Sequence, residues 1–160
     1  MNSGLLDVRK DRYMSRERPP DQRHTWRQKV KIVDATSGTH TFYVDFGEYA
    51  DGRLAEVFIT AHKTGSFVRG TLDSLARSIS LAIQSGTSPL DMAKQLRGQN
   101  YPPQGIVQAE GSMVKECLSI TDYIGQEIEA NYGEDGKRTT FEGQPPLDRP
   151  IGGYEHGLGV

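Results

Sequence analysis

The sequence predicts an α+β fold, in which a three-stranded antiparallel β-meander is followed by about three helices, with extended arms at both ends. β-Branched and aromatic residues are concentrated in short runs from residue 27 to residue 61, and apolar residues then recur at helical spacing. Neither end of the chain carries such a pattern. We therefore divide the chain into a basic extended arm (1–26), a folded body (27–132) and a Gly/Pro-rich tail (133–160).

The first three elements of the body are strands joined by short turns. Val30 and Ile32 alternate with lysines, and after a Ser-Gly-Thr turn residues 41–46 are β-branched or aromatic. An Asp-Gly dipeptide then makes a strong turn before the third strand, residues 54–61. Short connections between consecutive strands predict antiparallel pairing.

Three helices are expected after the meander. Apolar residues follow one helical face through residues 66–86, and Ser66 is a favourable N-cap. A short helix is expected within residues 88–98, where a Ser-Pro pair begins it and a glycine closes it. A third apolar stripe covers residues 113–128 and includes Cys117, which on such a face is a small packed hydrophobic residue rather than a reactive thiol.

Composition excludes several classes of function. Cys117 is the only cysteine of the 160 residues, so the chain has no internal disulfide framework, multi-cysteine zinc cluster or dithiol pair. The four histidines have no ligand spacing, so we expect no metal, and no motif indicates a cofactor. No apolar run approaches the length of a membrane span or signal peptide. We expect a soluble, intracellular (cytoplasmic) protein without a membrane partner.

The net charge of −2 hides a basic arm on an acidic body. Residues 1–31 carry nine Lys or Arg and four Asp or Glu, whereas residues 32–132 carry seven and twelve. Such an arm is either a solvated leader or a surface that contacts polyanions. Within residues 1–31, Arg23, Arg27 and Lys29 are candidate binding residues.

The loop before the first helix is a candidate anion site. Free backbone N–H groups, the positive end of a helix dipole, a hydroxyl and two cations converge there. The glycine spacing is not that of a Walker loop. An equally good interpretation is that Ser66 only caps the helix. Arg77 on the helix and Arg53 before the third strand would extend a basic strip. The candidate phosphate-binding or nucleic-acid-binding residues are Lys63, Thr64, Gly65, Ser66, Arg69, Arg77, Arg53, Arg23, Arg27 and Lys29.

The order of these segments can be compared with that of a known domain family. The runs FYV to Gly47, DGRLAEVFITAHKTGSFVRGTLDSLARSISLAIQSGTSPLDMAKQLRG, YPPQGIV and SITDYIGQEI stand in sequence over residues 18–132. This arrangement resembles the C-terminal, TSCPD-related domain of adenosylcobalamin-dependent (class II) ribonucleotide reductases. The resemblance implies shared ancestry and fold.

The departures from that family concern its chemistry. The resemblance places radical chemistry in a barrel of about 250 residues, for which this sequence has no room. The reductases also use several cysteines, whereas one is present here, and residues 111–115 (GSMVK) stand where the family has a Cys-Pro-Asp element. The resemblance therefore does not imply that this chain reduces nucleotides by itself, and because the barrel and the cysteines are missing we expect a noncatalytic chain.

Three functions remain open. The first is a stand-alone, noncatalytic relative that binds nucleic acid or a nucleotide phosphate as a homo-oligomer, through backbone contacts with little sequence preference. The second is an accessory subunit of a split reductase, docked on a separate barrel subunit. The third is an assembly protein that uses its terminal arms. We rank the first highest, because mere docking gives no reason for a basic arm.

Overall fold

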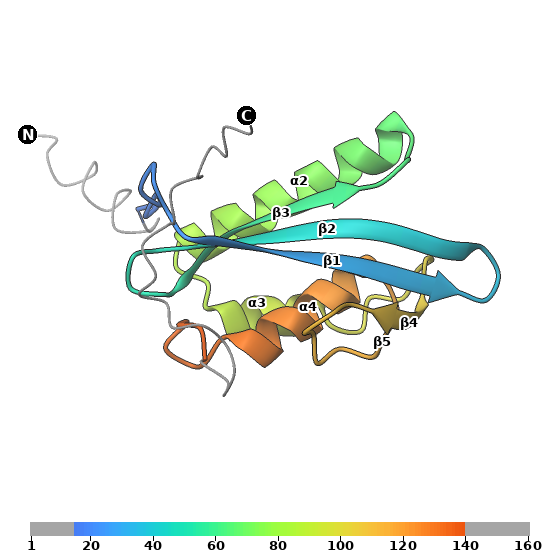
Figure 1. Cartoon of the computed structure of the whole chain (residues 1–160). Coiled ribbons are helices and arrows are strands. Elements are labelled where there is room, and N and C mark those ends of the chain that lie inside the picture. The colour runs from blue at the N-terminus through green and yellow to red at the C-terminus, as the bar shows by residue number, and fades with distance from the viewer. Residues whose placement is uncertain (1–14, 140–160) are drawn as a thin grey trace, which may run out of the picture.

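Strand β1 (Thr25–Asp34) is the centre of a five-stranded antiparallel sheet in the computed structural model, which describes residues 15–139. The strand order is β3-β2-β1-β4-β5 (Figure 1). The other strands are β2 (Gly38–Glu48), β3 (Leu54–Ala61), β4 (Gly105–Gln108) and β5 (Glu116–Cys117). The predicted α+β class and meander are confirmed, and the meander is extended by two short strands that the sequence pattern did not indicate.

Three helices complete the described part of the chain: α2 (Ser66–Gln84), α3 (Pro89–Leu96) and α4 (Ile120–Asn131). The predicted cap of α2 is wrong, because Gly65 is the N-cap, without a side-chain hydrogen bond, and Ser66 is the first helical residue. The third helix begins later than its apolar stripe suggests. Ser119 caps α4 by accepting from the Asp122 N–H, and the chain before it returns to the sheet as β5.

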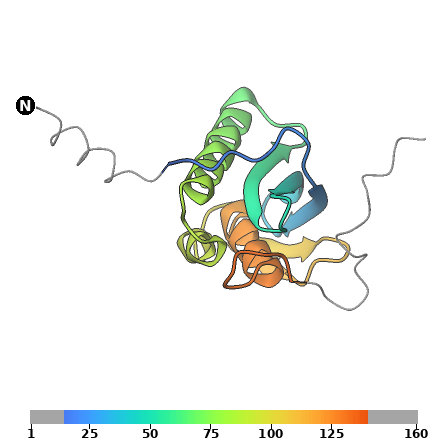
Figure 2. The same cartoon turned by 90° about the vertical axis from the view of Figure 1, so that its left-hand side faces the viewer.

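The helices cover one face of the sheet. Every second residue of the central strands is buried beneath them, for example Ile32 on β1 and Val44 on β2. From the helices, Ile79 and Ile124 close the same core, and Figure 2 shows the three helices gathered on one side of the strands. Burying each such side chain stabilises the fold by about 1.5–3 kcal/mol. The opposite face, among the described residues, carries no helix, and we call it the open face.

The described ends of the chain lie against the body. The Glu17 N–H donates to the Gln84 carbonyl at 2.8 Å, which fixes residues 15–24 beside the end of α2. At the other end, the Thr139 N–H donates to the Asn131 carbonyl at 2.8 Å, so residues 133–139 turn back on α4. The remaining parts of the predicted arms, residues 1–14 and 140–160, lie outside the described residues.

Candidate functional site

The structure does not bring the ten candidate residues together. Arg53 precedes β3 and Lys63 follows it, so an eight-residue strand of roughly 25 Å separates them. Arg23, Arg27 and Lys29 belong to β1 or the segment before it. The candidates therefore form separate groups rather than one basic strip.

Most of the candidate arginines are matched by carboxylates. Arg27 makes a bidentate contact with Asp45, at 2.6 and 2.8 Å, which raises the pKa of the guanidinium. Neutralised cations of this kind have less to gain from a phosphate. The other pairs are Arg53 with Glu17 and Asp51, Arg77 with Asp73, and Arg23 with Glu56.

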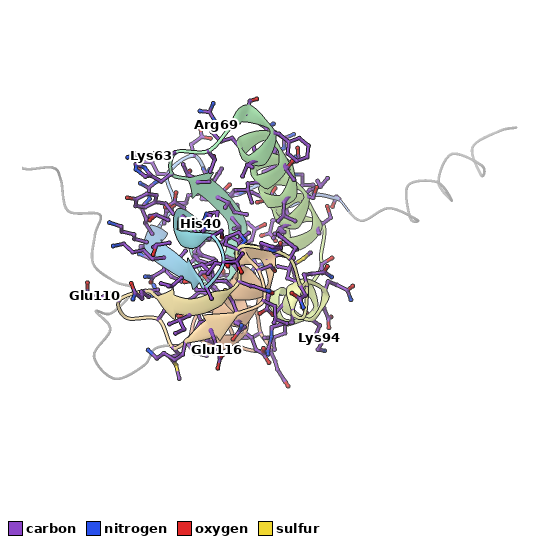
Figure 3. The ribbon with its side chains drawn as sticks, turned by 90° about the vertical axis from the view of Figure 1, so that its right-hand side faces the viewer. His40, Lys63, Arg69, Lys94, Glu110 and Glu116 are labelled. Atoms are coloured by element: carbon purple, nitrogen blue, oxygen red, sulfur yellow. The ribbon has the colours of Figure 1, made fainter. Side chains whose placement is uncertain are left out.

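At the start of α2, the positive charges are not neutralised by carboxylates of the described residues. Lys63 adopts a left-handed φ of 52° and is exposed, as is Arg69, and neither makes an ion pair with another described residue. The first turn of the helix contains no acidic residue, and its cap is the backbone of Gly65. The Thr64 hydroxyl is buried and has no hydrogen-bond partner within residues 15–139. Figure 3 shows Lys63 and Arg69 at this end of the molecule.

A second positive group lies on the open face. Arg27, Lys29 and Lys31 alternate with the half-buried Gln28 and the buried Val30 along β1, so their side chains share this face. Lys29 is opposite Tyr43 on β2, and its ammonium lies 6.0 Å from the centre of the Tyr43 ring. Lys31 was not among the candidates. Its period-two spacing from Arg27 and Lys29 was the signal that could have found it.

These residues border a groove of about 530 Å³. It runs beside β1 where the chain leaves β4, and it is lined by both lysines of the strand, neither of which has an ion-pair partner within residues 15–139. Its lining residues are Arg27, Gln28, Lys29, Lys31, Gln108, Ala109 and Glu110. The groove therefore combines cations, two side-chain amides and one carboxylate.

Other features of the described chain concern metal ligands, membrane spans and buried carboxylates. Among residues 15–139, no cluster of three or more His, Cys, Asp or Glu side chains is arranged to hold a metal ion. No helix in the same range is long and apolar enough to span a membrane. The buried carboxylates of Glu48 and Glu127 are held by hydrogen bonds inside the body.

Comparison with known proteins gives the family. The profile of the TSCPD domain matches residues 12–132. The chain belongs to the TSCPD domain family. This confirms the resemblance drawn from the segment order.

Relatives of this TSCPD domain are vitamin B12-dependent ribonucleotide reductases. The protein from Agrobacterium fabrum is 34% identical over 73% of the chain, and that from Bradyrhizobium diazoefficiens is 36% identical over 73%. The protein from Rhodopirellula baltica is 32% identical over 69% of the chain. The matches cover 9%, 9% and 10% of these relatives, so the chain spans about a tenth of their length. No solved structure matches it significantly.

The cysteine of this TSCPD domain is expected to be inert in the native state. Cys117 is buried on β5, and burial raises the pKa of its thiol to about 11. Because the thiolate is the reactive form, we expect native protein to react with a disulfide reagent at least tenfold more slowly than unfolded protein. Titration with and without denaturant measures this, and equal rates would contradict it.

Proposed function

We propose that this TSCPD domain is a noncatalytic module that binds nucleic acid through phosphates. The observation that carries the proposal is the presence of two lysines, Lys29 and Lys31, on the open face without a carboxylate partner among the described residues. The free cations at the start of α2 add a second contact region. Each lysine or arginine that neutralises a phosphate releases counterions, which favours binding.

The arrangement favours phosphates over base edges. The cations without an ion-pair partner among residues 15–139 lie on a sheet face and at a helix end, whereas Arg77, further along the exposed side of α2, is paired with Asp73. The matched arginines contribute less, since a phosphate must displace Asp45 from Arg27 before it can bind there. Affinity should therefore be modest, weakly dependent on sequence and dependent on salt.

The salt dependence tests this function. With two to four phosphates neutralised, the logarithm of the binding constant for duplex DNA should fall with log salt at a slope of about −2 to −4. The double substitution Lys63→Gln with Arg69→Gln should reduce the steepness by about 1 to 2. Fluorescence anisotropy across a salt series measures both.

The matched control neutralises cations elsewhere. Lys94→Gln with Lys137→Gln removes the same charge, from α3 and from the turn after α4, and should leave the slope unchanged. Binding that persists at high salt, or equal effects of the two double substitutions, would count against phosphate recognition.

The comparisons favour a second candidate, docking on a reductase polypeptide. The chain matches only about a tenth of each vitamin B12-dependent ribonucleotide reductase at 32–36% identity, so a domain of this kind works elsewhere as part of a larger protein. On this view it would accompany a reductase subunit from its own organism. Copurification with such a subunit, without salt-sensitive DNA binding, would favour docking over the first proposal.

Oligomerisation is part of the first proposal. A small body with one open sheet face would gain a second set of phosphate contacts from a symmetric copy. Light scattering on the free protein gives the mass directly, and it is run beside the binding measurements so that affinity can be interpreted per subunit.

A further inference from the structure

We propose that the groove beside β1 is a site for single-stranded nucleic acid, in which Lys29 and Lys31 hold successive phosphates, while Tyr43, which lies outside the groove on the β2 side of Lys29, stacks on a base. This inference rests on the proposed function and deepens it. It assigns the ligand to one surface and selects single strands over duplex. The argument uses the path of the chain, the spacing of the cations and the position of the ring.

The groove exists because β1 is paired with β4 along only part of the edge that faces β4. On the β4 side, the register covers Lys31 to Val33, whereas β1 begins at Thr25. The chain leaves the sheet after Gln108, and the Gln28 side-chain amide donates to the Glu110 carbonyl at 3.1 Å. The first half of β1 therefore has no strand partner on this edge among the described residues, and the groove lies between it and residues 108–110.

The cations of β1 are spaced like the phosphates of an extended strand. Arg27, Lys29 and Lys31 lie at every second residue, so their Cα atoms are about 7 Å apart along one face. Adjacent phosphates in an extended single strand are separated by a similar distance. Arg27 is held by Asp45, which leaves the two lysines as the free pair. A single strand running along β1 can contact both at once.

An aromatic ring lies within reach of the same ligand. Tyr43 is half-buried on β2, directly opposite Lys29, and alternates with the buried Phe42 and Val44, so its ring lies on the open face. The ammonium of Lys29 and the guanidinium of Arg27 lie 6.0 and 5.6 Å from the ring centre. A nucleotide phosphate bound to Lys29 therefore places its base beside Tyr43. Exposed rings on sheet faces stack unpaired bases in this way.

These features disfavour a duplex in the groove. The bases of a duplex are already stacked on one another, so a tyrosine ring on a sheet has no base face to cover. The groove volume of about 530 Å³ lies within the range of small-ligand sites, about 300–1,000 Å³, and suits a nucleotide. The Glu110 carboxylate lines the groove beside the lysines and repels phosphates there, which limits the length of strand that is bound.

The test compares one labelled oligothymidylate with a duplex of equal length by fluorescence anisotropy, using the whole chain. Lys29→Gln with Lys31→Gln is expected to weaken single-strand binding about tenfold or more and to flatten its salt dependence. Tyr43→Leu is expected to weaken it about tenfold with an unchanged salt slope, because stacking releases no counterions. Lys94→Gln with Lys137→Gln is the charge-matched control, and Trp26 fluorescence verifies that each variant is folded.

The outcomes separate this inference from the function on which it rests. If the groove variants bind single strands like the wild type while Lys63→Gln with Arg69→Gln binds less, the groove assignment is overturned, and phosphate binding stands only through the cations at the start of α2. If Tyr43→Leu has no effect, or duplex and single strand lose affinity equally, the preference for single strands is overturned. If the wild type binds neither probe, both proposals fail.

Discussion

Replacing Gly105 with alanine is expected to lower the free energy of unfolding by about 3 kcal/mol or more. Gly105 begins β4 with a φ of +141°, a conformation that L side chains rarely adopt. A Cβ atom at this position would lie 2.2 Å from the Val33 carbonyl oxygen of β1. Because that neighbour is backbone in the middle of the sheet, relief requires β4 to move away from β1. Denaturant unfolding followed by the fluorescence of Trp26, the only tryptophan, measures the loss.

Gly111→Ala is the matched control for this prediction. Gly111 also has a positive φ, +77°, but a Cβ atom there meets open space. Its expected cost is therefore only the conformational part, about 1 kcal/mol. Similar losses for the two variants would show that the approach of β4 to β1 is not tight. A larger loss for Gly105→Ala would assign the difference to the contact with Val33.

Replacing Glu48 with leucine is expected to cost about 3 kcal/mol. The Glu48 carboxylate is 1% exposed and accepts hydrogen bonds from the Tyr132 hydroxyl at 2.8 Å and the Trp26 indole at 3.2 Å. The His24 ring lies 2.9 Å from its other oxygen. Leucine leaves the Tyr132 hydroxyl without this acceptor, and a buried unsatisfied donor costs about 1–3 kcal/mol. The Trp26 indole keeps a second acceptor, the Tyr132 oxygen at 3.0 Å.

Glu48→Gln and Tyr132→Phe separate the contributions. Glutamine keeps an acceptor oxygen for Tyr132 and Trp26, so its expected loss is smaller than that of leucine. The pair Glu48→Leu and Tyr132→Phe forms a double-mutant cycle, and contact between the two groups predicts a coupling of about 1 kcal/mol or more. If Glu48→Leu were as stable as the wild type, the desolvation of the carboxylate would outweigh its hydrogen bonds.

The fold could be predicted where its signals are local. The meander and α2 follow from periodicity within single segments, and the cap and proline of α3 lie beside each other in the sequence. Strands β4 and β5 are four and two residues long, too short for a periodic signal, and they exist because β1 pairs with β4. The stripe that includes Cys117 fits a helix equally well, and only the return of the chain to β4 makes that segment a strand.

The candidate site was predicted less well, because charge in the sequence does not show which partner neutralises it. Arg53 meets Glu17, 36 residues away, and Arg27 meets Asp45, 18 residues away. Both arginines were candidates for phosphate binding. The loop at Lys63 was recognised from its position before a helix, a local feature. Lys31, which completes the pair in the groove, was missed.

The sequence by itself determined the α+β class, the membership of the TSCPD family suggested by segment order, and the absence of the several cysteines that the resemblance requires for reductase chemistry. These properties depend on residue type and on spacing along the chain. The tertiary structure decided which cations are matched, which face of the sheet is open and where β1 borders a groove. Those properties depend on contacts between residues far apart in the chain, which only folding brings within the few ångströms over which ion pairs and hydrogen bonds act.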